Sequence, residues 1–215
     1  MSNPHWLYIP DLFEKDKYTS LLEELKPHLT QGKVSLFGET FDERRLTAYF
    51  TTTNTKMYYS GRWLEPLMPP TTSIIELLFT HVNSQSFVSD IKVRYNIILP
   101  VFNAVFVNWY RPPNDTDKPD GLGPHSDDEG YLASSIILSI TYCEKYGARM
   151  FRFHEKTGKS TKIVQQYELE DGSALFMLGE CQKLYKHSVS DRKLDSKKRP
   201  ITGGRINLTF RSVKI

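Results

Sequence analysis

Two stretches in the first ninety residues carry apolar side chains at helical spacing. Within residues 14–29, apolar positions recur every three or four residues, which predicts an amphipathic helix. A second helix is predicted over residues 71–86, where Ser73 and Glu76 have the spacing of a capping box ahead of an apolar run. Both predicted helices come early in the chain.

The pattern becomes almost entirely β-type from residue 91 onward. Strands are predicted at residues 91–98, 102–110, 133–142, 149–153, 161–168, 173–178, 183–189 and 204–213. Shorter strands, separated by turns, are also predicted between residues 33 and 61. Many short strands at this spacing, without an internal repeat or a long linker, predict one α+β domain over residues 1–215 with a sandwich or barrel core.

Composition adds that the chain is globular and favours a reducing compartment. It has 215 residues, of which 39% are hydrophobic and 25% charged, and no apolar run approaches the 18 residues of a membrane span. The two cysteines, Cys143 and Cys181, lie among apolar residues and are predicted to be buried free thiols. We therefore expect an intracellular location, and the nucleus if the source is eukaryotic.

The charge is unevenly distributed although the net charge is only +3. Between Lys183 and Arg205 eight basic residues stand against two acidic ones, so this segment carries +6. A basic stripe on a nearly neutral protein suits contact with a polyanion, although a solvated loop explains it equally well at this stage.

Three residues could bind a metal ion. His125 and Asp127 are two positions apart, so on an extended chain both side chains point the same way. His187 lies in a later predicted strand, which a β-sandwich can place beside them. Two histidines and one carboxylate on one face match the facial triad of non-haem Fe(II) oxygenases, although zinc accepts the same ligands.

The C-terminal strand RINLTFR supports the iron interpretation. Arg205, Asn207, Thr209 and Arg211 share one face of this strand, and apolar residues occupy the other. Such oxygenases commonly use a 2-oxo acid with two carboxylates, and arginine is well suited to pair with the distal one. The strand therefore predicts a buried anion site.

These motifs together resemble the AlkB family of Fe(II)- and 2-oxoglutarate-dependent dioxygenases. The resemblance covers roughly residues 34–212 and rests on Asn108-x-Tyr110, His125-x-Asp127, His187 and the RINLTFR strand. The HSDDE sequence and RRLTAYF followed by YYSG resemble the branch that repairs nucleic acids. The resemblance implies a double-stranded β-helix (jelly-roll) core at about residues 91–213, flanked by N-terminal helices and a β-hairpin lid for nucleotide recognition at about residues 33–62.

The resemblance also implies a role for each matching residue. Fe(II) would be bound by His125, Asp127 and His187. 2-Oxoglutarate would be held by Asn108, Tyr110, Arg205, Asn207, Thr209 and Arg211, the last also lying near the iron carboxylate. The substrate side would comprise Phe37 as an apolar wedge, Arg45, Tyr59 stacking on the base, and Asp128 and Glu129 near it. A phosphate-binding loop would comprise Arg192, Lys193, Lys197, Lys198 and Arg199.

At two places in the lid, either of two adjacent residues could take the role that the family motif assigns. Glu43 stands where the family pattern has proline, so the arginine of the motif is either Arg44 or Arg45, and we prefer Arg45. Tyr58 competes with Tyr59 for the stacking role if the register differs by one residue.

The implied activity is oxidative demethylation of 1-methyladenine and 3-methylcytosine in double-stranded DNA, with Fe(II), O2 and 2-oxoglutarate. The base would leave the stack to reach the metal. The protein is expected to be a monomer and to have no membrane partner. Two alternatives are the same chemistry on RNA or protein side chains, and a non-catalytic nucleic-acid-binding module with a vestigial metal site. Completeness of the ligand set argues against the second alternative.

Overall fold

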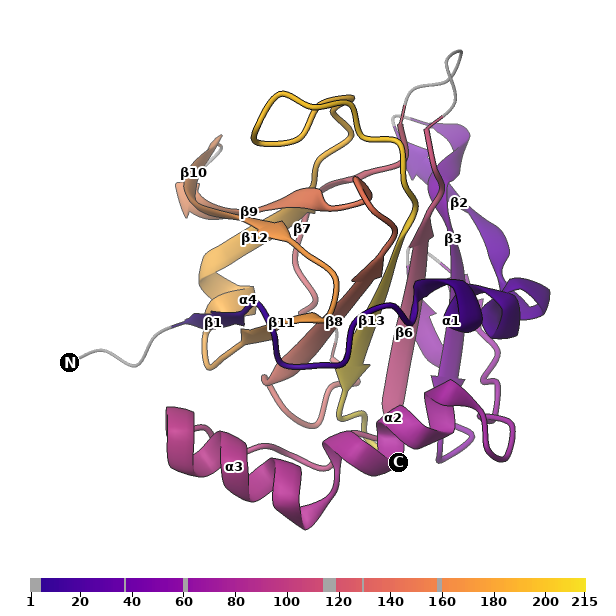
Figure 1. Cartoon of the computed structure of the whole chain (residues 1–215), viewed down its shortest axis with the longest axis vertical. Helices are drawn as coiled ribbons and strands as arrows, with labels where there is room; N and C mark the ends of the chain where they lie inside the picture. Colours follow the sequence, from indigo (N-terminus) through magenta and orange to yellow (C-terminus); the bar gives the residue numbers. More distant parts are fainter. Residues whose placement is uncertain (1–4, 37, 60–61, 114–118, 129, 158–159) are drawn as a thin grey trace.

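The computed structural model describes residues 5–36, 38–59, 62–113, 119–128, 130–157 and 160–215 (Figure 1). Its core consists of two antiparallel sheets. The larger sheet contains, in spatial order, β1 (Trp6–Ile9), β11 (Ser173–Met177), β8 (Ile137–Cys143), β13 (Arg205–Arg211), β6 (Ala104–Tyr110), β3 (Glu39–Thr51) and β2 (Thr30–Leu36). The smaller sheet contains β10 (Ser160–Leu169), β9 (Arg149–Thr157), β12 (Tyr185–Val189) and β7 (Leu122–His125). This arrangement confirms the predicted α+β jelly-roll.

The two central strands of the larger sheet separate apolar from polar side chains. On β13, Ile206, Leu208 and Phe210 are fully buried in the cluster beneath the helices. The alternate residues of β13, and those of β6 from Phe106 to Tyr110, point to the opposite face because side chains alternate along a strand. That opposite face is the interior between the two sheets, where the site lies.

The helices cover the outer face of the larger sheet (Figure 1). They are α1 (Tyr18–Leu25), the 3-10 turn η1 (Lys26–His28), α2 (Ile74–Val82) and α3 (Gln85–Tyr95), while the short α4 (Cys181–Leu184) precedes β12. The predicted helix cap is present, since Ser73 Oγ accepts a hydrogen bond from the Glu76 N–H at 3.1 Å. The Glu76 carboxylate accepts from the Thr72 N–H, one residue before the position in a full capping box. None of the helices in the described residues is long and apolar enough to cross a membrane.

The prediction of a strand at residues 91–98 is wrong. Ser84 begins another helix, because its Oγ accepts a hydrogen bond from the Phe87 N–H at 3.3 Å. Phe87 and Ile91 are then buried one helical turn apart, and α3 runs to Tyr95 before Asn96 ends it with a φ of 56°. After the helices, the strands of the core therefore resume at Ala104 and not at residue 91.

The predicted lid region forms a long hairpin. β2 and β3 are joined at residues 37 and 38, and Gly38 adopts a φ of 85° that glycine tolerates without strain. Only the second half of β3, from Leu46 to Thr51, pairs with β6, so the first half of β3 pairs with β2 alone. A separate two-stranded sheet, β4 (Met57–Tyr59) and β5 (Arg62–Leu64), follows.

Both cysteines are free and buried, as the sequence predicted. Burial raises the pKa of each thiol to about 12, so neither forms a thiolate at neutral pH.

Candidate metal and cosubstrate site

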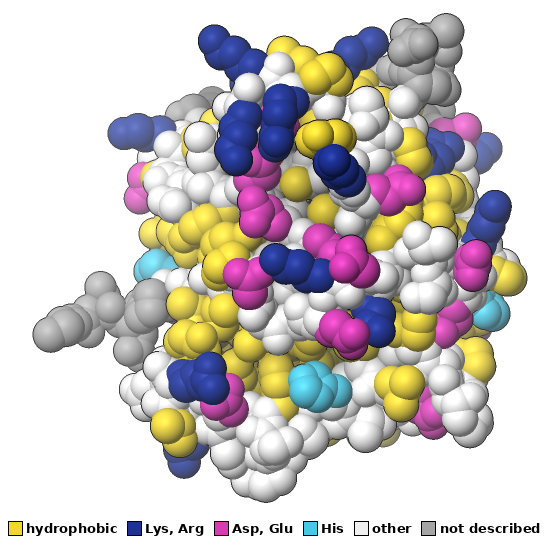
Figure 2. All heavy atoms as spheres, in the orientation of Figure 1, with side chains coloured by type: hydrophobic (Ala, Val, Ile, Leu, Met, Phe, Trp, Pro, Cys, Tyr) yellow, Lys and Arg dark blue, Asp and Glu magenta, His cyan; other side chains and the backbone are white. Residues whose placement is uncertain are grey.

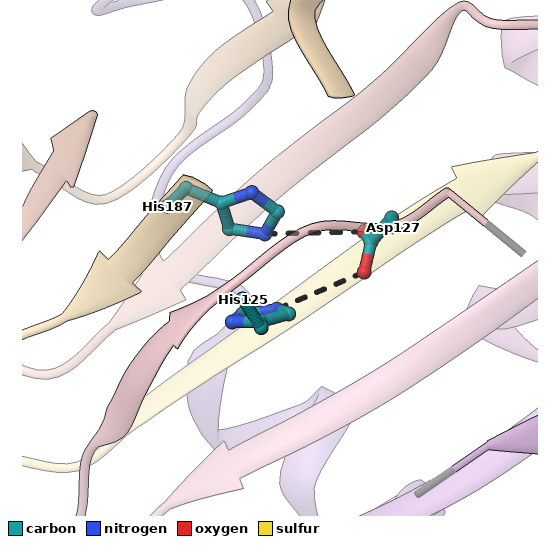
Figure 3. A group of neighbouring side chains, drawn as sticks. All are labelled: His125, Asp127 and His187. Carbon is teal, nitrogen blue, oxygen red and sulfur yellow. Dashed lines mark ion pairs between the residues drawn. The ribbon is translucent and has the colours of Figure 1, made fainter. Parts of the chain in front are cut away.

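His125, Asp127 and His187 meet between the two sheets (Figure 3). His125 ends β7 and His187 lies opposite it in register on β12, while Asp127 follows β7 by two residues. Nε2 of His125 lies 3.7 Å from Asp127 Oδ1, and Nε2 of His187 lies 3.9 Å from Asp127 Oδ2. The three groups thus face a common point, as the sequence predicted.

The protonation states suit metal ligation. Burial opposes ionisation of Asp127, but Arg211 Nη2, 2.7 Å from Oδ2, and the two histidines hold the pKa of this carboxyl well below its usual range. Burial lowers the pKa of His125, and it lowers that of His187 to about 3. At neutral pH the site therefore offers two neutral imidazoles and a carboxylate, the forms that bind metal.

Groups around the ligands fix their orientation. His125 Nδ1 lies 3.0 Å from the Gly123 carbonyl oxygen, which leaves Nε2 toward the metal point. Gln182 Oε1 accepts a hydrogen bond from the Asp127 N–H at 2.9 Å and so holds the backbone there. Nothing in the sequence around Gln182 signals this contact, because Asp127 is 55 positions away.

The residues predicted to hold 2-oxoglutarate line the interior beside this triad. Asn108, Tyr110, Asn207, Thr209 and Arg211 share one cavity with the three metal-site residues. The Asn207 amide is already used within the protein, since its Nδ2 donates to Ser139 Oγ at 2.7 Å and its Oδ1 accepts from Thr209.

Arg205 lies beside this cavity in a position suited to an anion. Its guanidinium is over the Tyr110 ring at 5.2 Å and donates to Thr141 Oγ1 at 3.0 Å. It is 1% exposed, and its Nε and Nη1 have no hydrogen-bond partner in the described part of the chain. Burial lowers the pKa of Arg205, which is the expected effect on a cation without a buried counter-charge.

The two candidate tyrosines of the lid differ in position. Tyr59 is buried, packs against Phe106 with ring centroids 4.5 Å apart, and lines the same cavity as the metal-site residues. Tyr58 is 46% exposed and contacts Trp63 edge-on. Tyr59 also borders a groove of about 850 Å³ that reaches the surface between β3 and β7.

The two candidate arginines are likewise separated. Arg45 is 2% exposed and donates hydrogen bonds to Asn108, Tyr59 and Glu43. Arg44 points outward and pairs with Asp191 at 3.0 Å. This placement favours Arg45, the residue preferred from the sequence.

Of three further predicted substrate contacts, one does not reach the site and two lie outside the described residues. The Asp128 side chain is 59% exposed and lies 4.0 Å from Lys156, on the outside of the smaller sheet, and it does not line the cavity. Phe37 and Glu129 lie outside the described residues.

The predicted phosphate-binding loop connects β12 to β13 at the top of the molecule (Figure 1). Figure 2 shows Lys and Arg side chains gathered there. Arg192, Lys193, Lys197 and Lys198 are exposed. Arg199 is also exposed but is committed to the protein, since it pairs with Asp195 at 2.7 Å and lies over the Tyr146 ring at 5.3 Å.

The fold and the site together define a class. The jelly-roll has two histidines and one carboxylate at its centre, next to a buried arginine whose Nε and Nη1 are unpaired within the described ranges. This arrangement fits an oxygenase with a non-haem metal and an acidic cosubstrate. Asp127 Oδ1, buried without a hydrogen-bond partner among the described residues, fits a metal ligand.

The chain belongs to the 2OG-Fe(II) oxygenase superfamily, whose family model matches residues 6–211. Its cofactor is therefore Fe(II), with 2-oxoglutarate and O2 as cosubstrates. Uncharacterized protein R406 of Acanthamoeba polyphaga mimivirus is 26% identical over 216 residues, covering 99% of this chain and 96% of the relative.

Two solved structures share the fold. The structure of OsALKBH1 has a TM-score of 0.57 at 18% identity and covers 99% of this chain and 100% of its own. An oxidoreductase of the 2OG-Fe(II) oxygenase family from Burkholderia pseudomallei has a TM-score of 0.56 at 9% identity. The match covers 97% of this chain and 85% of that structure's chain. The resemblance predicted from the sequence is thus confirmed at the level of superfamily and fold.

Proposed function

We propose that this chain demethylates 1-methyladenine and 3-methylcytosine in DNA by oxidation of the N-methyl group. The observation that carries the proposal is that Tyr59 and the metal-site residue His125 line both the interior cavity and the surface groove. An aromatic ring beside the metal site suits a flat base, and a base must leave the duplex to reach a buried metal.

The protein's own residues would position the reactants. When bound, Fe(II), 2-oxoglutarate and O2 supply the oxidation that converts the N-methyl group to a hydroxymethyl group, with succinate and CO2 as co-products. The hydroxymethyl compound then releases formaldehyde and the unmodified base. His125, Asp127 and His187 would hold the metal, and Arg205 would pair with the distal carboxylate. Phe106, Phe151 and Met177 line the cavity and would keep water away from the methyl group.

The proposal is tested with iron-loaded protein and a panel of matched substrates at one salt concentration. We expect formaldehyde release from methylated duplex DNA, at a rate above that on matched single-stranded DNA, RNA or methylated peptide. Higher activity on RNA or peptide would redirect the chemistry to that substrate. Binding of methylated DNA without any 2-oxoglutarate consumption would identify a non-catalytic module. Loss of duplex activity alone in Phe37→Ala would support a wedge at the hairpin tip.

Tyr59→Ala is expected to lower kcat/KM for methylated DNA by about 5- to 150-fold, since base stacking contributes about 1–3 kcal/mol. Tyr58→Ala is the matched comparison, and we expect it to stay within about twofold of the unchanged protein because Tyr58 lies at the surface. Steady-state formaldehyde release measures both. A larger loss at Tyr58 than at Tyr59 would contradict the assignment of the stacking residue.

Replacing Lys193, Lys197 and Lys198 together with glutamine is expected to weaken DNA binding and flatten its salt dependence. Each lost phosphate contact reduces the slope of log K against log salt by about 0.9 on duplex DNA. Fluorescence anisotropy at several salt concentrations measures this slope. An unchanged slope would show that the basic loop does not touch the DNA backbone.

A further inference from the structure

We propose that Arg45 is a positioning residue that links the 2-oxoglutarate site to the base platform by orienting the Asn108 amide and the Tyr59 ring. The part that concerns Tyr59 rests on the proposed function. The part that concerns Asn108 rests only on the superfamily's need for 2-oxoglutarate.

Arg45 stands at the centre of a compact buried network. Its Nε donates to Asn108 Oδ1 at 2.7 Å, and its Nη2 donates to the Tyr59 hydroxyl at 3.0 Å and to Glu43 Oε1 at 3.2 Å. The side chains of Arg45 and Glu43 are 3% and 4% exposed. One guanidinium thus touches a residue of β6, the lid strand β4 and its own strand β3.

The contact with Asn108 determines which end of the amide the cavity receives. A guanidinium only donates hydrogen bonds, so the Asn108 amide must turn its oxygen toward Arg45. The amide NH2 group is then directed away from Arg45, and Asn108 lines the cavity that holds the metal-site residues. Arg45 therefore makes Asn108 present its NH2 group, a hydrogen-bond donor and not an acceptor, to an anionic cosubstrate.

The contact with Tyr59 fixes the other side of the network. The Tyr59 ring packs against Phe106 with ring centroids 4.5 Å apart, and its hydroxyl accepts a hydrogen bond from Arg45 Nη2 at 3.0 Å. The hydrogen bond from Arg45 fixes the position of the hydroxyl end of the ring. Loss of Arg45 would leave the ring packed but free to shift.

Glu43 makes a buried cation tolerable at this place. Burial alone would lower the pKa of Arg45, but Tyr59, Tyr110 and Glu43 outweigh burial and raise it. Arg45 therefore remains charged.

The first experiment measures the binding of N-oxalylglycine, an unreactive isostere of 2-oxoglutarate, to protein loaded with Mn²⁺ by calorimetry. Arg45→Met is expected to weaken binding about tenfold, the effect of losing one oriented hydrogen bond to a charged ligand. Arg44→Met is the matched control, since Arg44 points to Asp191 at the surface, and should leave the affinity unchanged. Unchanged affinity in Arg45→Met would overturn the proposal.

A double-variant cycle separates positioning from a general structural effect. If Arg45 acts through Asn108, Arg45→Met combined with Asn108→Ala should bind N-oxalylglycine as weakly as Asn108→Ala alone. Additive losses would overturn the proposed route through Asn108. Arg45→Lys serves if Arg45→Met fails to fold, because lysine keeps the charge beside Glu43 but cannot donate to Asn108 and Tyr59 in the same geometry. Wild-type affinity and wild-type turnover in folded Arg45→Lys would also overturn it.

The Tyr59 arm uses Tyr59→Phe, which keeps the ring and removes the hydroxyl. This variant should bind N-oxalylglycine normally but lower kcat/KM for methylated DNA about as much as a lost hydrogen bond does, roughly fivefold. Normal turnover by Tyr59→Phe would overturn the platform half of the proposal. Absence of turnover on every methylated substrate would contradict the proposed function. The N-oxalylglycine binding results would then still decide the part of the proposal that concerns Asn108.

Discussion

Replacing His187 with alanine is expected to reduce turnover by at least about 100-fold, because removal even of residues that only orient metal ligands costs 10- to 100-fold. His187 supplies one of the three groups that face the metal point, 3.9 Å from Asp127. The protein should remain folded, since His187 faces the metal point and its neighbour Phe151, whose ring is stacked on it at 5.3 Å, keeps its own place in the apolar cluster. Metal content, measured after dialysis against Fe(II) under anaerobic conditions, should fall with activity.

Two further variants make this prediction decisive. His187→Gln keeps most of the side-chain volume and so reports the loss of the imidazole with less disturbance of packing. His154→Gln is the control, because His154 is also a buried histidine of the smaller sheet but contacts Ser188 at 2.8 Å and lies outside the metal group. Near-normal turnover in folded His187→Ala would show that the triad assignment is wrong.

Replacing Arg205 with methionine is expected to have opposite effects on ligand binding and on the stability of the ligand-free protein. The KM for 2-oxoglutarate should rise by about 30-fold or more, since losing one partner of a buried charge pair costs about 2–5 kcal/mol. Without the ligand, Arg205 is a buried cation whose pKa is lowered by burial and whose Nε and Nη1 lack partners in the described structure. Methionine removes that cost, so the ligand-free variant should melt at the same temperature or higher.

Steady-state kinetics checks the expected rise in KM. Thermal unfolding with and without N-oxalylglycine checks the expected stability of the ligand-free variant. The unchanged protein should gain stability on adding the ligand, and Arg205→Met should gain much less at the same concentration. Arg94→Met is the control, because Arg94 pairs with Asp90 on the exposed face of α3. An unchanged KM in Arg205→Met would show that another residue holds the distal carboxylate.

The sequence was sufficient wherever the information is local. Alternation along RINLTFR separates Arg205 and Arg211 from Phe210, because the period of a strand is fixed by its backbone. The H-x-D spacing likewise directs His125 and Asp127 to one point, and the Ser73 cap marks the start of α2. Local reasoning failed at residues 91–98, where apolar and polar residues alternate as they do in a strand although residues 91–95 form the end of α3.

The tertiary structure decided which of two adjacent residues enters the site. Arg45 and Tyr59 are buried while Arg44 and Tyr58 point outward, because the register of β3 on β6 and the position of the β4–β5 pair set the inward face. Asp128 looked like part of the site by its place after Asp127, yet it lies outside because neighbouring residues point to opposite sides.

The sequence by itself therefore determined the superfamily, the metal-site residues and the arginines that face the interior. Only the tertiary structure revealed Gln182 behind Asp127 and Arg45 between Asn108 and Tyr59. These contacts join residues 14 to 63 positions apart, and no local periodicity encodes them. The physical reason is that a strand's own pattern fixes which face a side chain takes, whereas the partner it meets there is set by packing between distant segments.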